Sequence, residues 1–174
     1  MKMTSWLKMG VLAAAVTASM GAYADNSLGS ITVTGSIISA GCSVDAASIA
    51  APVELGVLPV ADFKAAGDHS ALVPFSVHLT ACPISQAGVN LLTSGAADAT
   101  NSKLIAVSGV TGLGVAIYNA DDTQINLNST SAFAAIDQVT AEATIPLKAA
   151  AMSNGGMVTD GEFTATTNFT LSYN

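Results

Sequence analysis

The fold of this chain is indicated most clearly by its last stretch, Gly161-Glu162-Phe163-Thr164-Ala165-Thr166-Thr167-Asn168-Phe169-Thr170-Leu171-Ser172-Tyr173-Asn174. Successive side chains of a β-strand point to opposite faces, so alternate residues of this stretch would share a face. One set is mostly apolar and aromatic: Phe163, Ala165, Thr167, Phe169, Leu171 and Tyr173. The other set, from Glu162 to Asn174, is entirely polar. This alternation predicts a strand with one face on a core and the other in water.

The predicted last strand has no later element to pair with. An unpaired strand edge exposes backbone N–H and C=O groups and is normally covered. We therefore expect an earlier segment of the chain, or another molecule, to pair with this strand.

The first 24 residues have the parts of a secretory signal peptide. Lys2 and Lys8 flank a short polar lead, residues 9–20 are apolar and alanine-rich, and Ala22-Tyr23-Ala24 has the small-x-small form of a cleavage site. A membrane anchor is the alternative, but the apolar run is shorter than the roughly 20 residues of a spanning helix. We predict export, with a mature chain from Asp25 that forms one domain.

The mature chain is acidic. Three lysines and no arginine remain beside twelve acidic residues, which gives a formal net charge of −9. Binding to nucleic acid or to an anionic lipid surface depends on Lys and Arg that neutralise phosphates. The composition therefore argues against both classes of partner.

The two cysteines are Cys42 and Cys82. An even count in an exported chain predicts one disulfide. A zinc site completed by His69 and His78 is the alternative, and it is less favoured because structural zinc ligands come in closely spaced pairs. No constellation of acid, base, nucleophile or metal ligand stands out, so we expect neither an enzyme nor a bound cofactor.

Strand-like alternation and turn residues recur through the mature chain, whereas helical periodicity is nearly absent. Only residues 60–66, with Asp62 as a possible cap, could form a helical turn or two. In the segment that ends at Ala81, the alternation places His78 outward, as a solvated surface residue. Several short strands separated by turns predict an all-β sandwich. The expected strands are 31–34, 36–38, 73–81, 89–92, 113–118, 124–127, 144–149 and the last stretch.

Four features of the mature chain carry a resemblance to a known family. The first is the run of residues 33–45, which leads into the first cysteine and ends in Gly41-Cys42-Ser43-Val44-Asp45. The second is the spaced pattern of Leu55-Gly56, Phe63, Gly67, Ser70, Pro74-Phe75, Leu79 and Cys82. The third is Leu113-Gly114-Val115-Ala116-Ile117-Tyr118 before an acidic turn, and the fourth is the terminus with Gly161, Phe169 and Tyr173. Together they resemble the major pilin subunits of type 1-like fimbriae, which Gram-negative bacteria assemble by the chaperone/usher pathway.

This resemblance implies an incomplete immunoglobulin-like β-sandwich that lacks its final strand, so that a groove exposes the core beside the last strand. In the family, a periplasmic chaperone fills the groove first, and at the outer-membrane usher the amino-terminal extension of the next subunit replaces it. The implied function is a structural subunit of a surface fimbria that polymerises by donor-strand exchange and supports cell adhesion. Its implied partners are copies of itself, the chaperone, the usher and tip adaptor or adhesin subunits.

The resemblance also divides the chain into a signal peptide (1–24), a donor-strand extension (25–35) and a pilin immunoglobulin-like domain (36–174). In the extension, the residues that would enter a neighbour's groove are Gly29, Ile31 and Val33. The residues expected to form the acceptor groove and to contact the chaperone are Gly161, Phe163, Phe169, Leu171, Tyr173 and Asn174. Two alternatives stay open: a minor or adaptor subunit, and a fibre with receptor-binding activity on its sides.

Overall fold

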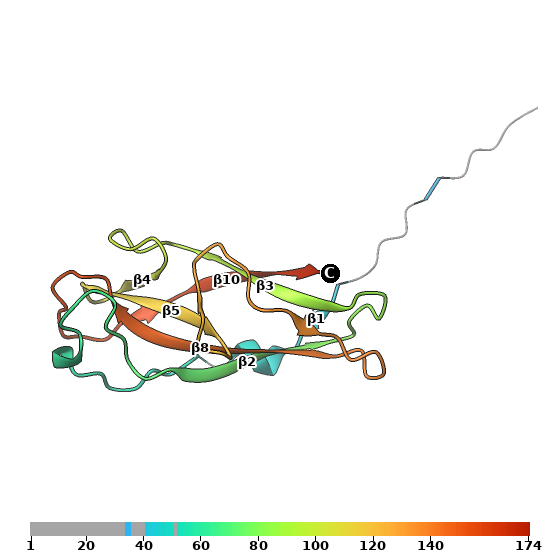
Figure 1. Ribbon diagram of the computed structural model, residues 1–174, viewed down its shortest axis with the longest axis horizontal. Coiled ribbons are helices and arrows are strands. Elements are labelled where there is room, and N and C mark those ends of the chain that lie inside the picture. The colour runs from blue at the N-terminus through green and yellow to red at the C-terminus, as the bar shows by residue number, and fades with distance from the viewer. Residues whose placement is uncertain (1–33, 36–40, 51) are drawn as a thin grey trace, which may run out of the picture. The chain divides into compact units, whose positions relative to one another are not determined.

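The computed structural model describes residues 34–35, 41–50 and 52–174. From residue 41 onward the described chain forms two antiparallel β-sheets that pack on each other, with β3 and β10 in one layer and β2, β5 and β8 in the other (Figure 1). The predicted signal peptide and nearly all of the predicted donor extension lie outside the described residues. No helix in the described part of the chain is long and apolar enough to cross a membrane.

The larger sheet has its strands in the order β1-β2-β8-β5-β4-β9, and β6 pairs with β5 beside this path. Every pairing in it is antiparallel. Its bounds are β1 (Ser43–Val44), β2 (Val73–Thr80), β4 (Ile105–Ser108), β5 (Leu113–Asn119), β6 (Gln124–Ile125), β8 (Ala143–Ser153) and β9 (Thr164–Ala165).

The smaller sheet has the order β10-β3-β7. Its strands are β10 (Thr167–Tyr173), β3 (Gly88–Gly95) and β7 (Ala134–Ala135). β10 pairs with β3 along its whole length and has no strand on its other side among the described residues. The last strand of the chain is therefore an edge strand in the structure.

The core lies between the two sheets and is built by alternate residues of their strands. Its buried members include Val77, Leu79, Val89, Leu91, Ile105, Val115, Ile117, Ile145 and Leu147. A second cluster covers the outer face of β5 and β8, where Leu104 packs against Ala116, Tyr118, Ala150 and Met152. The centre of the larger sheet is thus buried on both faces, and that explains why β5 and the end of β8 are apolar without alternation.

The structure confirms most of the strands predicted within the described residues: 73–81, 89–92, 113–118 and 144–149 overlap with β2, β3, β5 and β8. Of the predicted strand 124–127, only residues 124–125 are a strand, β6. β8 runs on to Ser153 because its last residues are buried on both sides and carry no alternation. The prediction missed the short strands β1, β4 and β7. The predicted strands at 31–34 and 36–38 fall almost wholly outside the described residues.

The helical prediction needs two corrections. Residues 60–66 contain only a 3-10 turn, η1 (Val60–Asp62), and Asp62 ends it rather than capping it. The carboxylate of Asp68 instead accepts hydrogen bonds from the N–H groups of Lys64 and Ala65 at 2.8 and 2.7 Å. A short helix that we did not predict, α1 (Ala46–Ala50), begins after Asp45, whose side chain accepts a hydrogen bond from the N–H of Ala47.

The last stretch is also not one strand. β9 pairs with β4 of the larger sheet, whereas β10 pairs with β3 of the smaller one, so the chain changes sheets at Thr166. Ala165, which we placed on the inward face, is exposed in consequence. From Thr167 onward the predicted alternation holds, because every odd-numbered residue of β10 is half-buried and every even-numbered one is exposed.

Candidate functional site

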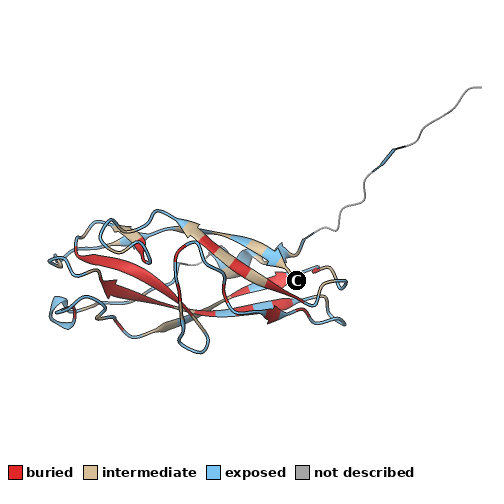
Figure 2. Ribbon diagram, turned by 45° about the horizontal axis from the view of Figure 1, so that its top comes forward, coloured by how far each residue is buried: buried red, intermediate tan, exposed pale blue. Residues whose placement is uncertain are grey.

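The open edge of β10 is the strongest candidate site, because burial falls sharply at this strand. In β3 the inward residues Val89, Leu91 and Thr93 are between 0% and 3% exposed. Their direct partners in β10 are Tyr173, Leu171 and Phe169, and these are only half-buried. Figure 2 shows this contrast, with red bands along β3 and none along β10. The core is therefore incompletely covered on the side where β10 has no neighbour.

Other half-buried apolar side chains pack at the margin of the same core, and together with the β10 residues we call them the open core border. They come from the segment before β2, from β2 itself, from β4 and from the stretch before β9. All pack against the main core cluster without being buried in it. With the β10 residues, the border consists of Cys42, Val44, Leu55, Phe75, Val107, Phe163, Phe169, Leu171 and Tyr173.

The far end of β10 is fixed by the residues around the first cysteine. The hydroxyl of Tyr173 accepts a hydrogen bond of 2.7 Å from the N–H of Cys42. A Cβ atom at Gly41 would lie 2.6 Å from that hydroxyl oxygen, so a side chain there would push the hydroxyl away from its position. Asn174 continues the pairing, since its N–H donates to the carbonyl of Gly88 and its own carbonyl accepts from Ala87.

Cys42 and Cys82 form a disulfide, as predicted. The bond joins the segment before β1 to the residues that follow β2, and both sulfur atoms are thereby unavailable as zinc ligands. The disulfide thus holds in place the backbone N–H that binds Tyr173.

The predicted acceptor residues do not all lie together. Phe169, Leu171 and Tyr173 share the inward face of β10. Phe163 contacts both the main core and a smaller cluster that contains Phe63, Leu113 and Ala151. Gly161 lies in the loop before β9, with φ of +145°, beside Val110. The predicted donor residues Gly29, Ile31 and Val33 lie outside the described residues. Sequence reasoning missed Leu55 and Phe75 as border residues, although both belonged to the pattern that we quoted.

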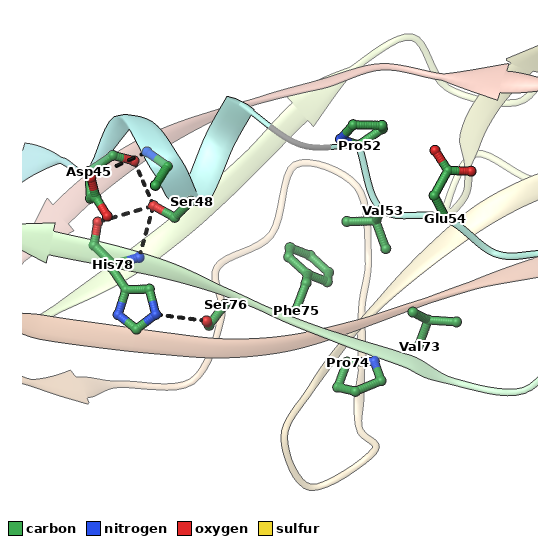
Figure 3. A pocket seen from close by; sticks show the side chains of 11 residues that line it. Asp45, Ser48, Pro52, Val53, Glu54, Val73, Pro74, Phe75, Ser76 and His78 are labelled. Atoms are coloured by element: carbon green, nitrogen blue, oxygen red, sulfur yellow. Dashed lines mark hydrogen bonds between the residues drawn. The ribbon is translucent and has the colours of Figure 1, made fainter.

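A shallow pocket lies next to β2, on the side away from β8, and Figure 3 shows its lining. Phe75 of the open core border takes part in it, together with Pro52, Val53 and Val73. His78 is exposed here, as predicted, and its ring forms hydrogen bonds with the hydroxyls of Ser76 and Thr144 at 3.1 and 3.0 Å. The imidazole thus has a hydroxyl partner on each of its two nitrogens.

The acidic turn between β5 and β6 accounts for two further carboxylates. Hydrogen bonds from the hydroxyl and the N–H of Thr123 hold the pKa of Asp121 below its usual value. Asp122 pairs with Lys148 of β8. Burial raises the pKa of the Tyr118 hydroxyl on the outer face of β5. The two carboxylates stabilise the turn between β5 and β6, and all three groups belong to a different sheet from β10.

The family model for fimbrial proteins matches residues 31–174. This chain belongs to the fimbrial protein family. The uncharacterized fimbrial-like protein SfmA of Escherichia coli (strain K12) is 38% identical over 120 residues, which cover 64% of this chain and 66% of that protein. Long polar fimbria protein A of Salmonella typhimurium is 32% identical over 169 residues, and the match covers 92% of each chain.

The fold of this fimbrial protein is also similar to a solved pilus structure. The P pilus rod subunit PapA matches with a TM-score of 0.67 and 22% identity, over 78% of this chain and all of that one. The fold class predicted from the sequence, an immunoglobulin-like sandwich that lacks a strand, agrees with this similarity and with the open edge of β10.

Proposed function

We propose that this fimbrial protein is a structural subunit of a surface fimbria and that it polymerises by donor-strand exchange. The observation that carries the proposal is the drop in burial between β3 and β10. Residues that are paired directly across the two strands differ in burial because no strand of the described chain covers β10 on its free side. A strand from another molecule would pair with the free edge and cover the open core border at the same time.

The predicted donor segment has the composition that this role needs. Gly29, Ile31 and Val33 share one parity, whereas Ser30, Thr32 and Thr34 share the other. A strand with this pattern has one apolar face for a neighbour's core and one polar face for water. Fully burying Ile31 and Val33 would stabilise the junction by roughly 1.5 to 3 kcal/mol each.

The open core border also indicates which partners the subunit needs before assembly. Before assembly an exported subunit would expose both an apolar surface and a strand edge, a combination that favours aggregation. A periplasmic chaperone that lends a strand would prevent this, and an outer-membrane usher would exchange it for the next subunit. We place the assembled chain in a fimbrium on the cell surface, next to copies of itself and to tip adaptor or adhesin subunits, with a role in adhesion and no catalytic role.

The test compares two substitutions in the donor segment. Ile31→Asp places a charge where an apolar side chain would be buried, whereas Thr32→Asp changes the opposite face of the same strand. We expect the Ile31→Asp subunit, and a deletion of residues 25–34, to form the disulfide and bind the chaperone but not to assemble. The readout is the ladder of heat-resistant polymers on gels, beside chaperone co-purification.

The Thr32→Asp subunit should form ladders close to those of the wild-type protein. Long ladders from the deletion variant would contradict the proposal. Failure of the deletion variant to bind chaperone would also contradict it, because the segment would then belong to the subunit's own fold.

A further inference from the structure

The larger sheet has a free edge of its own, at β2. β1 pairs with β2 only through Ser43 opposite Thr80 and Val44 opposite Leu79. After Val44 the chain turns away into α1, so the first part of β2 has no strand on this side among the described residues. This second free edge belongs to a different sheet from β10.

Three backbone groups of β2 point out of this edge. The carbonyl of His78 accepts a hydrogen bond from the N–H of Asp45 at 2.9 Å, and the N–H of His78 donates to the hydroxyl of Ser48 at 3.3 Å. Both groups of His78 therefore face away from β8, and alternate residues of an antiparallel strand repeat this direction. The N–H and carbonyl of Ser76 and the carbonyl of Pro74 thus face the same edge. No hydrogen bond between described residues reaches these three groups.

The shallow pocket of Figure 3 lies along this edge and has a volume of about 400 Å³. Asp45 and Glu54 lie at opposite ends of its lining, and the side chains of Phe75 and Val53 lie between them (Figure 3). Phe75 is half-buried and Val53 is exposed. The pocket therefore combines unpaired backbone groups with an apolar centre and a carboxylate at each end.

The charges of the pocket are complementary to a cation. Asp45 and Glu54 both line it, and no lysine lines it among the described residues. His78 is the other titratable group there, and its ring already bonds the hydroxyls of Ser76 and Thr144. The mature chain has three lysines, no arginine and twelve acidic residues, so the surrounding potential is also negative.

We infer that this pocket binds an extended segment of a basic polypeptide, which adds a strand to the free edge of β2. One residue of the segment exchanges two hydrogen bonds with Ser76, and its two neighbours place apolar side chains on the side of Phe75. The next residue at each end brings a lysine or arginine toward Asp45 or Glu54. The chain's own residues 25–35 contain no basic residue, so the partner that fits is a different polypeptide.

The test uses assembled fibres, in which a donated strand covers the edge of β10. The probe is the amidated peptide Lys-Val-Ser-Val-Lys with a fluorescent label at its amino terminus, and fluorescence anisotropy measures its binding. Ser76→Pro removes the N–H at the free edge of β2, a position where a strand tolerates proline. Ser76→Ala is the matched control, because both variants lose the hydroxyl that bonds His78. We expect Ser76→Pro fibres to bind about three- to tenfold more weakly than Ser76→Ala fibres, the effect of one hydrogen bond.

A second pair of variants tests the charge. Glu54→Lys changes the pocket, whereas Asp160→Lys makes the same change in net charge on an exposed loop. We expect Glu54→Lys fibres to bind the peptide at least about threefold more weakly than Asp160→Lys fibres at low salt. The difference should shrink at about 1 M salt, where the screening length is about 3 Å.

A methylated peptide separates strand addition from attraction by charge alone. An N-methyl group on its serine removes the N–H that would donate to the carbonyl of Ser76 but keeps both lysines, so wild-type fibres should bind it more weakly. Equal binding of the two peptides would overturn the inference. So would absence of binding to wild-type fibres, or equal binding by Ser76→Pro and Ser76→Ala fibres. If Ser76→Pro prevents fibre formation, the Glu54→Lys comparison and the methylated peptide still decide the question.

Discussion

The hydroxyl of Tyr173 accepts a 2.7 Å hydrogen bond from the backbone N–H of Cys42, across 131 positions of the sequence. This bond joins the end of β10 to the disulfide that closes the sandwich. The strand that borders the uncovered core is therefore held at its end by a covalently fixed backbone group. We therefore expect the acceptor side of the subunit to be more stable when the two cysteines are oxidised.

Replacing Tyr173 by Phe should destabilise the oxidised subunit. The substitution leaves the N–H of Cys42 without its acceptor, at a cost of about 1 kcal/mol. Tyr118→Phe is the matched control, because the Tyr118 hydroxyl is buried with no hydrogen-bond partner among the described residues. Its removal should leave stability unchanged or raise it. Urea unfolding at low protein concentration measures the free energy of unfolding of both variants. Equal losses of stability would show that the hydrogen bond to Cys42 contributes nothing.

Removing the disulfide should have a larger effect. The bond joins residues that are 40 positions apart. A disulfide that closes a loop of that size stabilises a fold by about 4 kcal/mol in the chain-entropy account. We expect the Cys42→Ala, Cys82→Ala double variant to unfold at much lower urea and to bind the chaperone poorly. In that variant the further loss from Tyr173→Phe should become smaller, and an undiminished loss would show that the two features act independently.

Much of this fold could be predicted from local patterns. The inward residues of β10 and those of β2 follow from alternation, and the disulfide follows from the cysteine count. The change of sheet at Thr166 could not be predicted, because alternation of period two continues through it. Alternation shows which side of a strand is apolar, but not which sheet the strand joins.

The other features that the sequence did not predict also depend on contacts between distant segments or are too short to show a period. The last residues of β8 are buried on both faces, so their sequence carries no period. Ala150 and Met152 pack with Leu104, and Ala151 packs with Phe63 and Leu113. Helix α1 is too short to show helical periodicity. The contact between Tyr173 and Cys42 depends on how the sandwich closes, and no pattern within a single segment indicates it.

Acid should weaken the subunit in part through Asp137. Hydrogen bonds from the N–H groups of Thr140 and Val139 hold the pKa of its carboxylate below the ordinary value of 3.8. A lowered pKa in the folded state contributes stability above that ordinary pKa, and the contribution is lost as the pH falls through the folded value. Asp137→Asn should therefore lower the urea midpoint at pH 7 and have progressively less effect below about pH 4.

Asp160→Asn is the control for this pH dependence. It removes the same charge from another loop, where Asp160 is exposed to water. We expect it to shift the midpoint less than Asp137→Asn at pH 7. If the urea midpoints of wild-type and Asp137→Asn protein differ by a constant amount from pH 7 to pH 2, the role of the carboxylate charge is contradicted.

The last prediction separates the two faces of β10. Leu171 points toward the uncovered core, and Thr170 beside it points to water. Leu171→Asp removes apolar surface that a lent strand would cover and puts a charge in its place, whereas Thr170→Asp leaves the inward face intact. Recovery of the chaperone complex should fall by at least about tenfold for Leu171→Asp, which corresponds to about 1.4 kcal/mol, and stay near wild type for Thr170→Asp. The two variants differ by one position in the same strand and carry the same new charge, so the comparison isolates orientation. Equal recovery of the two complexes would show that the chaperone does not contact the inward face of β10.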